Sequence, residues 1–281
     1  MMRREIFRSS SSTQVDQMTL ALSNVDNNTI LPYFEPNIGP NPKKFKPSAE
    51  LFKYLPKDAT FRKGTLFKKC SVVGNAGLLL HSACGKEIDS ADYVFRCNMV
   101  PIKKFSEDAG LKTNFTTMNP SIYGTRYNYF KRDSDIEKFN FDLKEYSGNL
   151  FLPCLMYSNS ANSCFKKVLP AIHNTNGRLT TRVGNSEHLL GILQKWKSSG
   201  IHLMSTGFYL TQTAITLCNE VHLFGFWSFS KAMYPVPREL QYHFFDDMKQ
   251  SKAHSFNTEF QLLWQLHVNG IINIHVNDCD G

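Results

Sequence analysis

The 281-residue sequence lacks several features that would assign it to a particular class of protein. No run of residues reaches the roughly 18 apolar positions that a membrane-spanning helix needs. The first twelve residues are basic and then serine-rich, without the apolar centre of a secretory signal. No two cysteines form a C-x-x-C pair, which argues against a structural zinc site of the finger type. The sequence therefore predicts neither a membrane span nor a zinc finger.

The net positive charge is small in the part of the chain that has the composition of a folded domain. The whole chain carries a net charge of +8. Residues 1–69 hold 12 Lys and Arg against 6 Asp and Glu, a net +6, which leaves only +2 for residues 70–281. A nucleic-acid-binding domain concentrates its basic residues on the folded surface. We therefore expect no nucleic acid partner and interpret the basic segment as a solvated arm.

The composition predicts one globular domain preceded by a loose segment. Hydrophobic residues make up 42% and charged residues 20% of the chain, which suits a sizeable core. Residues 1–30 are polar and without periodicity, and residues 31–64 are rich in proline. We expect a disordered stem region over residues 1–64 and a single folded domain over residues 65–281.

Short apolar runs alternate with helical patterns in the predicted domain. Strands are predicted at 69–73, 93–98, 114–118, 150–155 and 221–226, and helices at 186–197, 206–218 and 258–268. Asn257 is the predicted N-cap of the last helix, and residues 84–92 read as a polar connection. Strands that alternate with helices imply an α/β fold with a mostly parallel sheet.

The cysteines leave two interpretations open. There are seven: Cys70, Cys84, Cys97, Cys154, Cys164, Cys218 and Cys279. Their wide spacing fits either the buried free thiols of a cytosolic protein or the long-range disulfides of a lumenal one. An odd number leaves at least one cysteine unpaired or in an intermolecular bond. Two Asn-x-Ser/Thr sequons, at Asn27 and Asn114, favour the secretory pathway and are candidate glycosylation sites.

Polar residues follow two of the predicted strands. In an open α/β sheet, ligands bind beyond the carboxyl ends of the strands. Asn75 lies in the loop Gly74–Gly77 after the first strand, and Asn98 ends the second, so the two amides could contact one polar ligand. Taken alone, the loop fits a tight turn without a ligand equally well. It lacks the first G-x-G of the dinucleotide fingerprint, so NAD is only weakly indicated.

Two later segments are also candidate sites. The turn Ser205–Gly207 opens the helix at 206–218, where hydroxyl and backbone N–H groups can hold a phosphate. The simpler interpretation is an ordinary serine N-cap. The cluster of His243, Asp246, His254 and Glu259 could supply a general base and a phosphate partner. Its simpler interpretation is a pair of surface histidines.

Together these segments resemble the four sialyl motifs of the animal sialyltransferases, in the same order. Residues 70–98, with Cys-Ser-Val-Val-Gly-Asn-Ala-Gly at their start, resemble the large motif, and residues 203–227 resemble the small motif. His243-Phe244-Phe245-Asp246 is similar to motif III, and His254 with Glu259 to the very small motif. The resemblance covers about residues 66–279. Residues 85–89, 119–121 and 225–227 are most similar to the alpha-2,8 branch.

The resemblance implies a function as well as a fold. It implies a variant GT-A fold and transfer of sialic acid from CMP-sialic acid to a sialylated glycan on a glycoprotein or glycolipid. The implied reaction is an inverting displacement with a histidine base, without a metal or other cofactor. Family members act in the Golgi lumen, and an N-terminal membrane anchor is expected in their full-length forms.

The resemblance also implies roles for individual residues. The implied CMP-sialic acid-binding residues are Asn75, Asn98, Asn119, Ser205, Thr206, Gly207 and Trp227. The equivalent of His254 is the catalytic base, and that of His243 contacts the phosphate. The implied disulfides are Cys70–Cys218 and Cys84–Cys279, which leaves Cys97, Cys154 and Cys164 without an assignment.

Some features depart from the family or point elsewhere. Phe244 stands where motif III usually has Tyr, and Ala76 replaces a commoner Ser or Gly. Two D-x-D segments, at 133–135 and 278–280, match a metal-nucleotide signature, but neither follows a strand at the binding edge, so we expect no metal. The alternative function is a non-catalytic lumenal protein that binds sialylated glycans. Short basic clusters at 43–46 and 62–69 favour mono- or oligosialylation over polysialylation.

Overall fold

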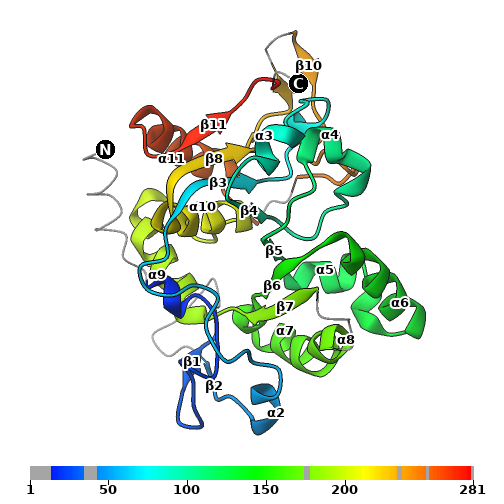
Figure 1. Ribbon diagram of the computed structural model, residues 1–281, viewed down its shortest axis with the longest axis vertical. Helices are drawn as coiled ribbons and strands as arrows, with labels where there is room; N and C mark the ends of the chain where they lie inside the picture. The colour runs from blue at the N-terminus through cyan, green and yellow to red at the C-terminus, as the bar shows by residue number, and fades with distance from the viewer. Residues whose placement is uncertain (1–13, 35–42, 174–177, 233–235, 251–252, 280–281) are drawn as a thin grey trace. The chain divides into compact units, whose positions relative to one another are not determined.

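The computed structural model describes residues 14–34, 43–173, 178–232, 236–250 and 253–279 (Figure 1). These residues belong to two compact units that alternate along the chain. Unit 1 contains Leu66–Asn114 and Lys195–Gly281, and unit 2 contains Thr13–Thr65 and Phe115–Gln194.

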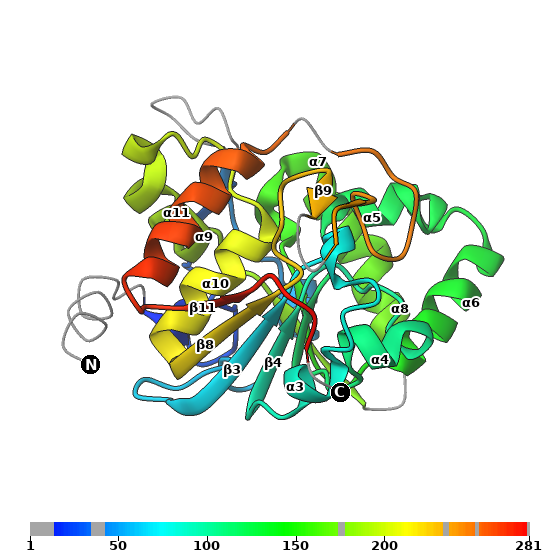
Figure 2. The ribbon, with the colours of Figure 1, turned by 90° about the horizontal axis from the view of Figure 1, so that it is seen from above.

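Unit 1 is built on four parallel strands in the order β11-β8-β3-β4. The strands are β3 (Phe67–Val73), β4 (Tyr93–Arg96), β8 (Cys218–Phe224) and β11 (Asn273–His275). The helices are α3 (Gly85–Asp89), α4 (Ser106–Ala109), α10 (Thr206–Leu217) and α11 (Phe256–Val268), and a two-stranded antiparallel ribbon pairs β9 (Lys231–Ala232) with β10 (Arg238–Glu239). Figures 1 and 2 show α10 and α11 on one side of the parallel strands and α3 and α4 on the other.

Burial explains why these segments form strands and a central helix. All four residues of β4 and the last four of β3 are buried, as expected where helices cover both faces of a parallel sheet. In α10, nine of twelve residues are buried, so this helix is apolar on nearly every side and lies in the core of unit 1.

Unit 2 contains three parallel strands in the order β5-β6-β7. They are β5 (Phe115–Thr117), β6 (Gly148–Leu152) and β7 (Leu179–Val183). The helices are α2 (Ala49–Phe52), α5 (Pro120–Thr125), α6 (Asp133–Asp142), α7 (Ser158–Ser163), α8 (Leu169–His173) and α9 (Ser186–Trp196), which begins in this unit, and a short ribbon pairs β1 (Leu31–Pro32) with β2 (Lys44–Phe45). The predicted α/β class with mostly parallel strands is confirmed.

The predicted disordered stem over residues 1–64 is wrong for the part that the structure describes. Met18, Leu20 and Phe34 are fully buried in unit 2. The N–H of Leu20 donates to the carbonyl of Val183 at 2.8 Å, and that of Phe34 to Leu155 at 2.7 Å. The polar composition concealed this packing because the apolar partners lie more than a hundred residues later in the chain. Residues 1–13 and 35–42 lie outside the described residues.

Each of the eight predicted helices and strands has a counterpart, with shifted ends. The strand predicted at 93–98 ends at Arg96, because Asn98 and Met99 have left-handed φ angles of 62° and 49°. The predicted N-cap Asn257 is wrong: α11 begins at Phe256, and Ser255 accepts the N–H of Glu259 at 2.9 Å. The connection at 84–92 contains α3, which the polar pattern did not predict.

The structure contains three disulfides among the described cysteines. Cys70–Cys218 and Cys84–Cys279 lie in unit 1 and are the pairs that the family resemblance implied. The third, Cys154–Cys164, lies in unit 2 and joins two cysteines that had no assignment. Cys97 is a free thiol, and burial raises its pKa to about 12. Six of the cysteines thus form disulfides, and the seventh is a buried free thiol.

The two sequons differ in exposure. Asn27 is exposed in a turn of unit 2. Asn114 is half-buried in unit 1, and its Oδ1 accepts the backbone N–H of Val94 at 2.9 Å. Asn27 is thus the more accessible of the two predicted glycosylation sites. No helix within the described segments is both long enough and apolar enough to cross a bilayer.

Candidate active site

The loop after β3 crosses closely over the end of β8. The N–H of Gly74 donates to the carbonyl of Phe224 at 2.8 Å, and that of Ala76 to Gly225 at 3.0 Å. A Cβ on Gly74 would lie 2.4 Å from the carbonyl oxygen of Gly225, whose own φ is +68°. Both positions therefore require glycine. The Gly74–Gly77 segment is a specific backbone crossing and not only a tight turn.

Asn75 connects this crossing to two other predicted motifs. Its Nδ2 donates to the carbonyl of Cys97 at 3.5 Å, and its backbone carbonyl accepts the N–H of Phe244 at 3.0 Å. Ala76 and His243 form an antiparallel bridge. The Oδ1 of Asn75 is buried and has no hydrogen-bond partner among the described residues. A buried acceptor of this kind fits a ligand that donates a hydrogen bond to it.

The other two predicted amides lie at element ends. Asn98 follows β4 in unit 1 and is half-buried, in the left-handed conformation that asparagine tolerates better than most residues. Asn119 belongs to unit 2, at the N-cap position of α5, with φ −69° and ψ 153°.

The first turn of α10 is held by two contacts. The Oγ of Ser205 accepts the N–H of Phe208 at 3.1 Å, so Ser205 is an N-cap. The N–H of Ser205 donates to Oε1 of Glu259 at 2.6 Å. A Cβ on Gly207 would lie 2.8 Å from the ring of Phe226, so the end of the small motif packs against its beginning. Thr206 is the first residue of the helix, and its N-terminus attracts anions.

His254 is oriented by a backbone carbonyl. Its Nδ1 lies 3.0 Å from the carbonyl oxygen of Leu203, which can only accept a hydrogen bond. The proton of the neutral ring is therefore on Nδ1, and Nε2 has a free lone pair. The ring is half-buried and packs against Phe256, with centroids 5.3 Å apart. This tautomer is the one that a general base requires.

His243 is fixed by a carboxylate and two aromatic rings. Its Nδ1 lies 2.9 Å from Oδ1 of Asp246. The ring stacks on Tyr242 and Phe245, with centroid distances of 4.2 and 5.0 Å. Asp246 accepts a hydrogen bond from the Nδ1–H of His243, which leaves Nε2 as the nitrogen that can face a ligand.

Trp227 uses its indole N–H within the protein. Its Nε1 donates to the carbonyl of Lys231 at 2.9 Å. The ring packs edge-on against Phe229 and Phe260, with centroids 5.0 and 5.4 Å away. Any role of Trp227 in binding a ligand therefore depends on its ring and not on the indole N–H.

The motifs thus meet in pairs within unit 1. The large motif contacts motif III through Asn75 and Phe244, and the small motif contacts the very small motif through Ser205 and Glu259. Phe244 is buried and packs edge-on against Phe105, an apolar surrounding that suits Phe in place of Tyr. The sequence showed Glu259 as one of a cluster, but it gave no signal that its partner is a backbone N–H 54 residues away.

The D-x-D segments have other contacts. Asp135 accepts the N–H of Arg132 at 3.0 Å, at the start of α6. Asp278 lies 3.5 Å from the guanidinium of Arg238. Asp280 is outside the described residues.

Unit 1 is thus an open parallel α/β unit, a class in which ligands bind beyond the carboxyl ends of the strands. Two solved crystal structures of mammalian sialyltransferases share the fold. One matches with a TM-score of 0.64 and 18% identity, covering 99% of this chain and 96% of that chain. The other, in complex with Gal-beta-1-3GalNAc-ortho-nitrophenol, matches with a TM-score of 0.57 and 21% identity, covering 81% and 77%.

The chain belongs to glycosyltransferase family 29, the sialyltransferases, whose family model matches residues 18–271. It is 35% identical over 250 residues to alpha-2,8-sialyltransferase 8E of Homo sapiens, covering 82% of this chain and 61% of that protein. It is 33% identical over 218 residues to alpha-N-acetylneuraminide alpha-2,8-sialyltransferase of Xenopus laevis, covering 75% and 59%. The chain thus spans about three-fifths of the length of these curated relatives.

Proposed function

We propose that this chain transfers sialic acid from CMP-sialic acid to a sialylated glycan on a glycoprotein or glycolipid, forming an alpha-2,8 linkage. Membership of the sialyltransferase family supports the transfer, and the names of the relatives support the linkage. The proposed place of action is the Golgi lumen, an environment in which three disulfides are stable.

The proposed reaction is a single displacement with inversion at the anomeric carbon. The oxygen of the acceptor hydroxyl attacks the anomeric carbon. At the same time the bond between this carbon and the phosphate oxygen breaks, and CMP departs as a phosphate monoester. The acceptor hydroxyl loses its proton to a base, and the phosphate gains negative charge. The reaction therefore requires one group that accepts a proton and several groups that stabilise an anion. It does not require a carboxylate nucleophile of the kind that retaining glycosidases use.

His254 is the proposed base. The observation that carries this assignment is the contact between Nδ1 and the carbonyl of Leu203, which leaves the lone pair of Nε2 free for the acceptor proton. His254 is half-buried, and the proposal requires that its Nε2 faces the acceptor.

His243 and the start of α10 are the proposed anion-stabilising groups. In its imidazolium form, His243 would donate from Nε2 to the phosphate and from Nδ1 to Asp246. Six residues of unit 1 complete the proposed CMP-sialic acid site: Asn75, Asn98, Ser205, Thr206, Gly207 and Trp227. Among them, Asn75 provides the buried oxygen that lacks a partner in the described residues. For Asn119, in unit 2, the same role is implied only by the family resemblance.

Two histidine variants test the division of roles. His254→Ala should lower turnover by at least about 100-fold, with CMP affinity nearly unchanged, because a neutral imidazole aimed at the acceptor contributes little to nucleotide binding. His243→Ala should weaken CMP binding by roughly 10- to 150-fold, because a charge-assisted hydrogen bond is lost. CMP affinity is measured by calorimetry beside a transfer assay, with His202→Ala, at an exposed histidine, as the control.

Two outcomes would overturn these assignments. If His254→Ala keeps most of its turnover, or if both variants lose CMP affinity equally, the proposed roles are wrong. If the unaltered protein binds sialylated glycans but neither transfers sialic acid nor releases CMP from CMP-sialic acid, it is the non-catalytic glycan-binding protein.

A further inference from the structure

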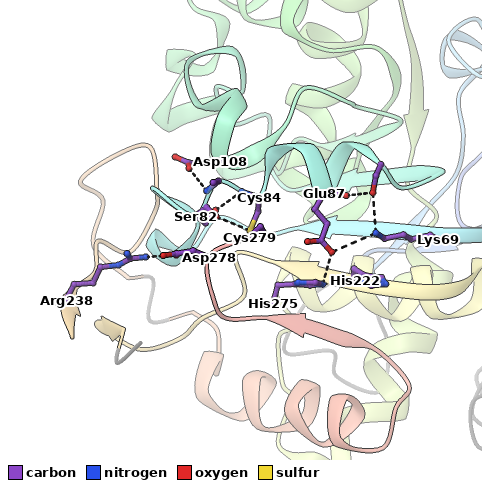
Figure 3. The surroundings of a disulfide bond; sticks show 12 residues. Lys69, Ser82, Cys84, Glu87, Asp108, His222, Arg238, His275, Asp278 and Cys279 are labelled. Carbon is purple, nitrogen blue, oxygen red and sulfur yellow. Dashed lines mark hydrogen bonds and ion pairs between the residues drawn. A yellow bond between two sulfur atoms is a disulfide. The ribbon is translucent and has the colours of Figure 1, made fainter. Parts of the chain in front are cut away.

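A cluster of metal-ligating side chains lies in unit 1 outside the proposed transfer site (Figure 3). His222 is in β8, His275 ends β11, and Glu87 is in α3. The Nδ1 of His222 and the Nε2 of His275 are 2.9 Å apart, and the same Nε2 lies 3.8 Å from Oε1 of Glu87. One possible ligand atom from each residue lies within 4.8 Å of the other two.

The sheet register explains why these residues meet. His222 pairs with Asn273, and Phe224 with His275, on the neighbouring parallel strands. Side chains two residues apart share a face of the sheet, so both histidines project from the same face. Ser71, which pairs with His222, donates from Oγ to the carbonyl of Ile88 at 3.1 Å. This bond places α3, and with it Glu87, over the histidines.

We propose that Glu87, His222 and His275 bind one Zn²⁺ ion, which links β8, β11 and α3. Two histidines and a carboxylate are a typical zinc ligand set, with a water molecule as the fourth ligand. Zinc–nitrogen bonds of about 2.1 Å at the tetrahedral angle require two nitrogens about 3.4 Å apart, so the two rings would separate by a few tenths of an ångström. The proposal does not depend on the transfer reaction, since none of the three ligands belongs to the proposed transfer site.

Glu220 supplies the partner that a zinc-bound histidine usually has. Its Oε2 lies 3.8 Å from the Nε2 of His222, and this nitrogen is buried with no hydrogen-bond partner among the described residues. A carboxylate beside Nε2 favours the proton there and leaves Nδ1 free for the metal. Both rings bind a metal in their neutral form.

The ammonium group of Lys69 would weaken zinc binding. Its Nζ lies 3.9 Å from Oε1 of Glu87 and 3.3 Å from Oγ of Ser90. An ammonium beside a zinc ligand competes with the metal for the same carboxylate and repels it. Replacing Lys69 with an uncharged residue of similar length should therefore tighten zinc binding, an effect that a mere loss of structure would not produce.

The test is a titration of the tag-free, disulfide-intact chain with ZnCl2 at pH 7.5. Calorimetry measures binding, and the melting temperature measures the change in stability. We expect one saturable equivalent and a higher melting temperature in ZnCl2 but not in MgCl2. His275→Gln should weaken binding at least about tenfold, and Glu220→Gln by about tenfold. Lys69→Met should tighten binding. His202→Gln, at an exposed histidine of the same unit, is the matched control and should bind as the unaltered chain does.

Three results of these titrations would overturn the proposal. The first is that zinc does not bind saturably near one equivalent. The second is that His275→Gln and the unaltered chain bind zinc with equal affinity, and the third is that Lys69→Met does not bind zinc more tightly. If His275→Gln does not fold, the stoichiometry of the unaltered chain and the affinity of Lys69→Met still decide the question. X-ray absorption of the zinc-loaded chain should show nitrogen and oxygen ligands only, and a sulfur ligand would also contradict the proposal.

Discussion

Glu259 is a single residue that holds two motifs together. Its Oε1 accepts the N–H of Ser205 at 2.6 Å, and its side chain is 3% exposed. Burial raises its pKa from the ordinary 4.5 to about 7, because a carboxylate loses its hydration inside the protein. Glu259 therefore positions the first turn of α10, where the phosphate of the sugar donor is proposed to bind.

This raised pKa gives a pH-dependent stability. Between pH 4.5 and 7 the folded chain keeps a proton on Glu259 that the unfolded chain releases, so its contribution to stability falls as the pH rises. Glu259→Gln keeps an acceptor oxygen without the charge. Relative to the unaltered chain, the free energy of unfolding of the variant should therefore increase across this window, by up to about 3 kcal/mol above pH 7.

Chemical denaturation at a series of pH values measures the difference. Glu239→Gln, at a largely exposed carboxylate paired with Lys231, is the control and should show no such trend. A constant difference between Glu259→Gln and the unaltered chain from pH 4.5 to 7.5 would show that Glu259 ionises normally.

A second prediction at this scale concerns metal dependence. Transfer should continue with little loss in excess EDTA, because His243 and the N-terminus of α10 would stabilise the departing phosphate without a cation. The assay follows sialic acid transfer before and after chelation. Complete inhibition that Mn²⁺ reverses would mean that a metal takes part in the reaction.

At the scale of elements, the crossing of the loops after β3 and β8 shapes the candidate site. Gly74→Ala would place a Cβ 2.4 Å from the carbonyl oxygen of Gly225, a backbone atom that cannot move aside cheaply. We expect a loss of about 1–3 kcal/mol in stability. We also expect weaker CMP binding, because Asn75 follows directly in the chain.

Gly270→Ala separates backbone strain from this steric effect. Gly270 has φ +70°, but no atom lies within 4 Å of its Cβ position. Its substitution should cost about 1–2 kcal/mol through the left-handed conformation alone and leave CMP affinity unchanged. Calorimetric titration of both variants decides the matter, and equal CMP affinities would contradict the proposed role of the crossing.

At the scale of the whole molecule, disulfides join segments that are distant in the sequence. Cys84 and Cys279 are 195 residues apart, and the N–H of Cys279 donates to the carbonyl of Ser82 at 2.7 Å (Figure 3). The bridge thus fixes the segment after β11 to the segment before α3. It closes a far longer loop than Cys154–Cys164, whose cysteines are 10 residues apart.

Loop length predicts how much each bridge stabilises. Replacing both Cys84 and Cys279 with serine should cost about 5 kcal/mol, and the same change at Cys154 and Cys164 about 3 kcal/mol, if the bridges act by limiting the unfolded chain. Denaturation of the two double variants tests the order. Mass mapping of the secreted protein without reduction should recover all three pairs. Reduced cysteines at these six positions in active protein would contradict the lumenal assignment.

Local sequence patterns were enough to predict the alternation of strands and helices, the order of the motifs and the placement of Asn75 after a strand. These properties are local, because hydrophobic periodicity, glycine turns and helix starts are set by neighbouring residues. The Cys70–Cys218 and Cys84–Cys279 pairs followed only from the resemblance to a family, since spacing alone leaves the pairing open.

The three-dimensional structure was needed to show which residues far apart in the chain come together. It showed that Met18, Leu20 and Phe34 pack into unit 2, where composition predicted a disordered stem. It also brought Glu87, His222 and His275 together from α3, β8 and β11. The physical reason is the same in each case. Burial and side-chain contacts depend on strand register and on the path of the chain, which no single segment of sequence contains.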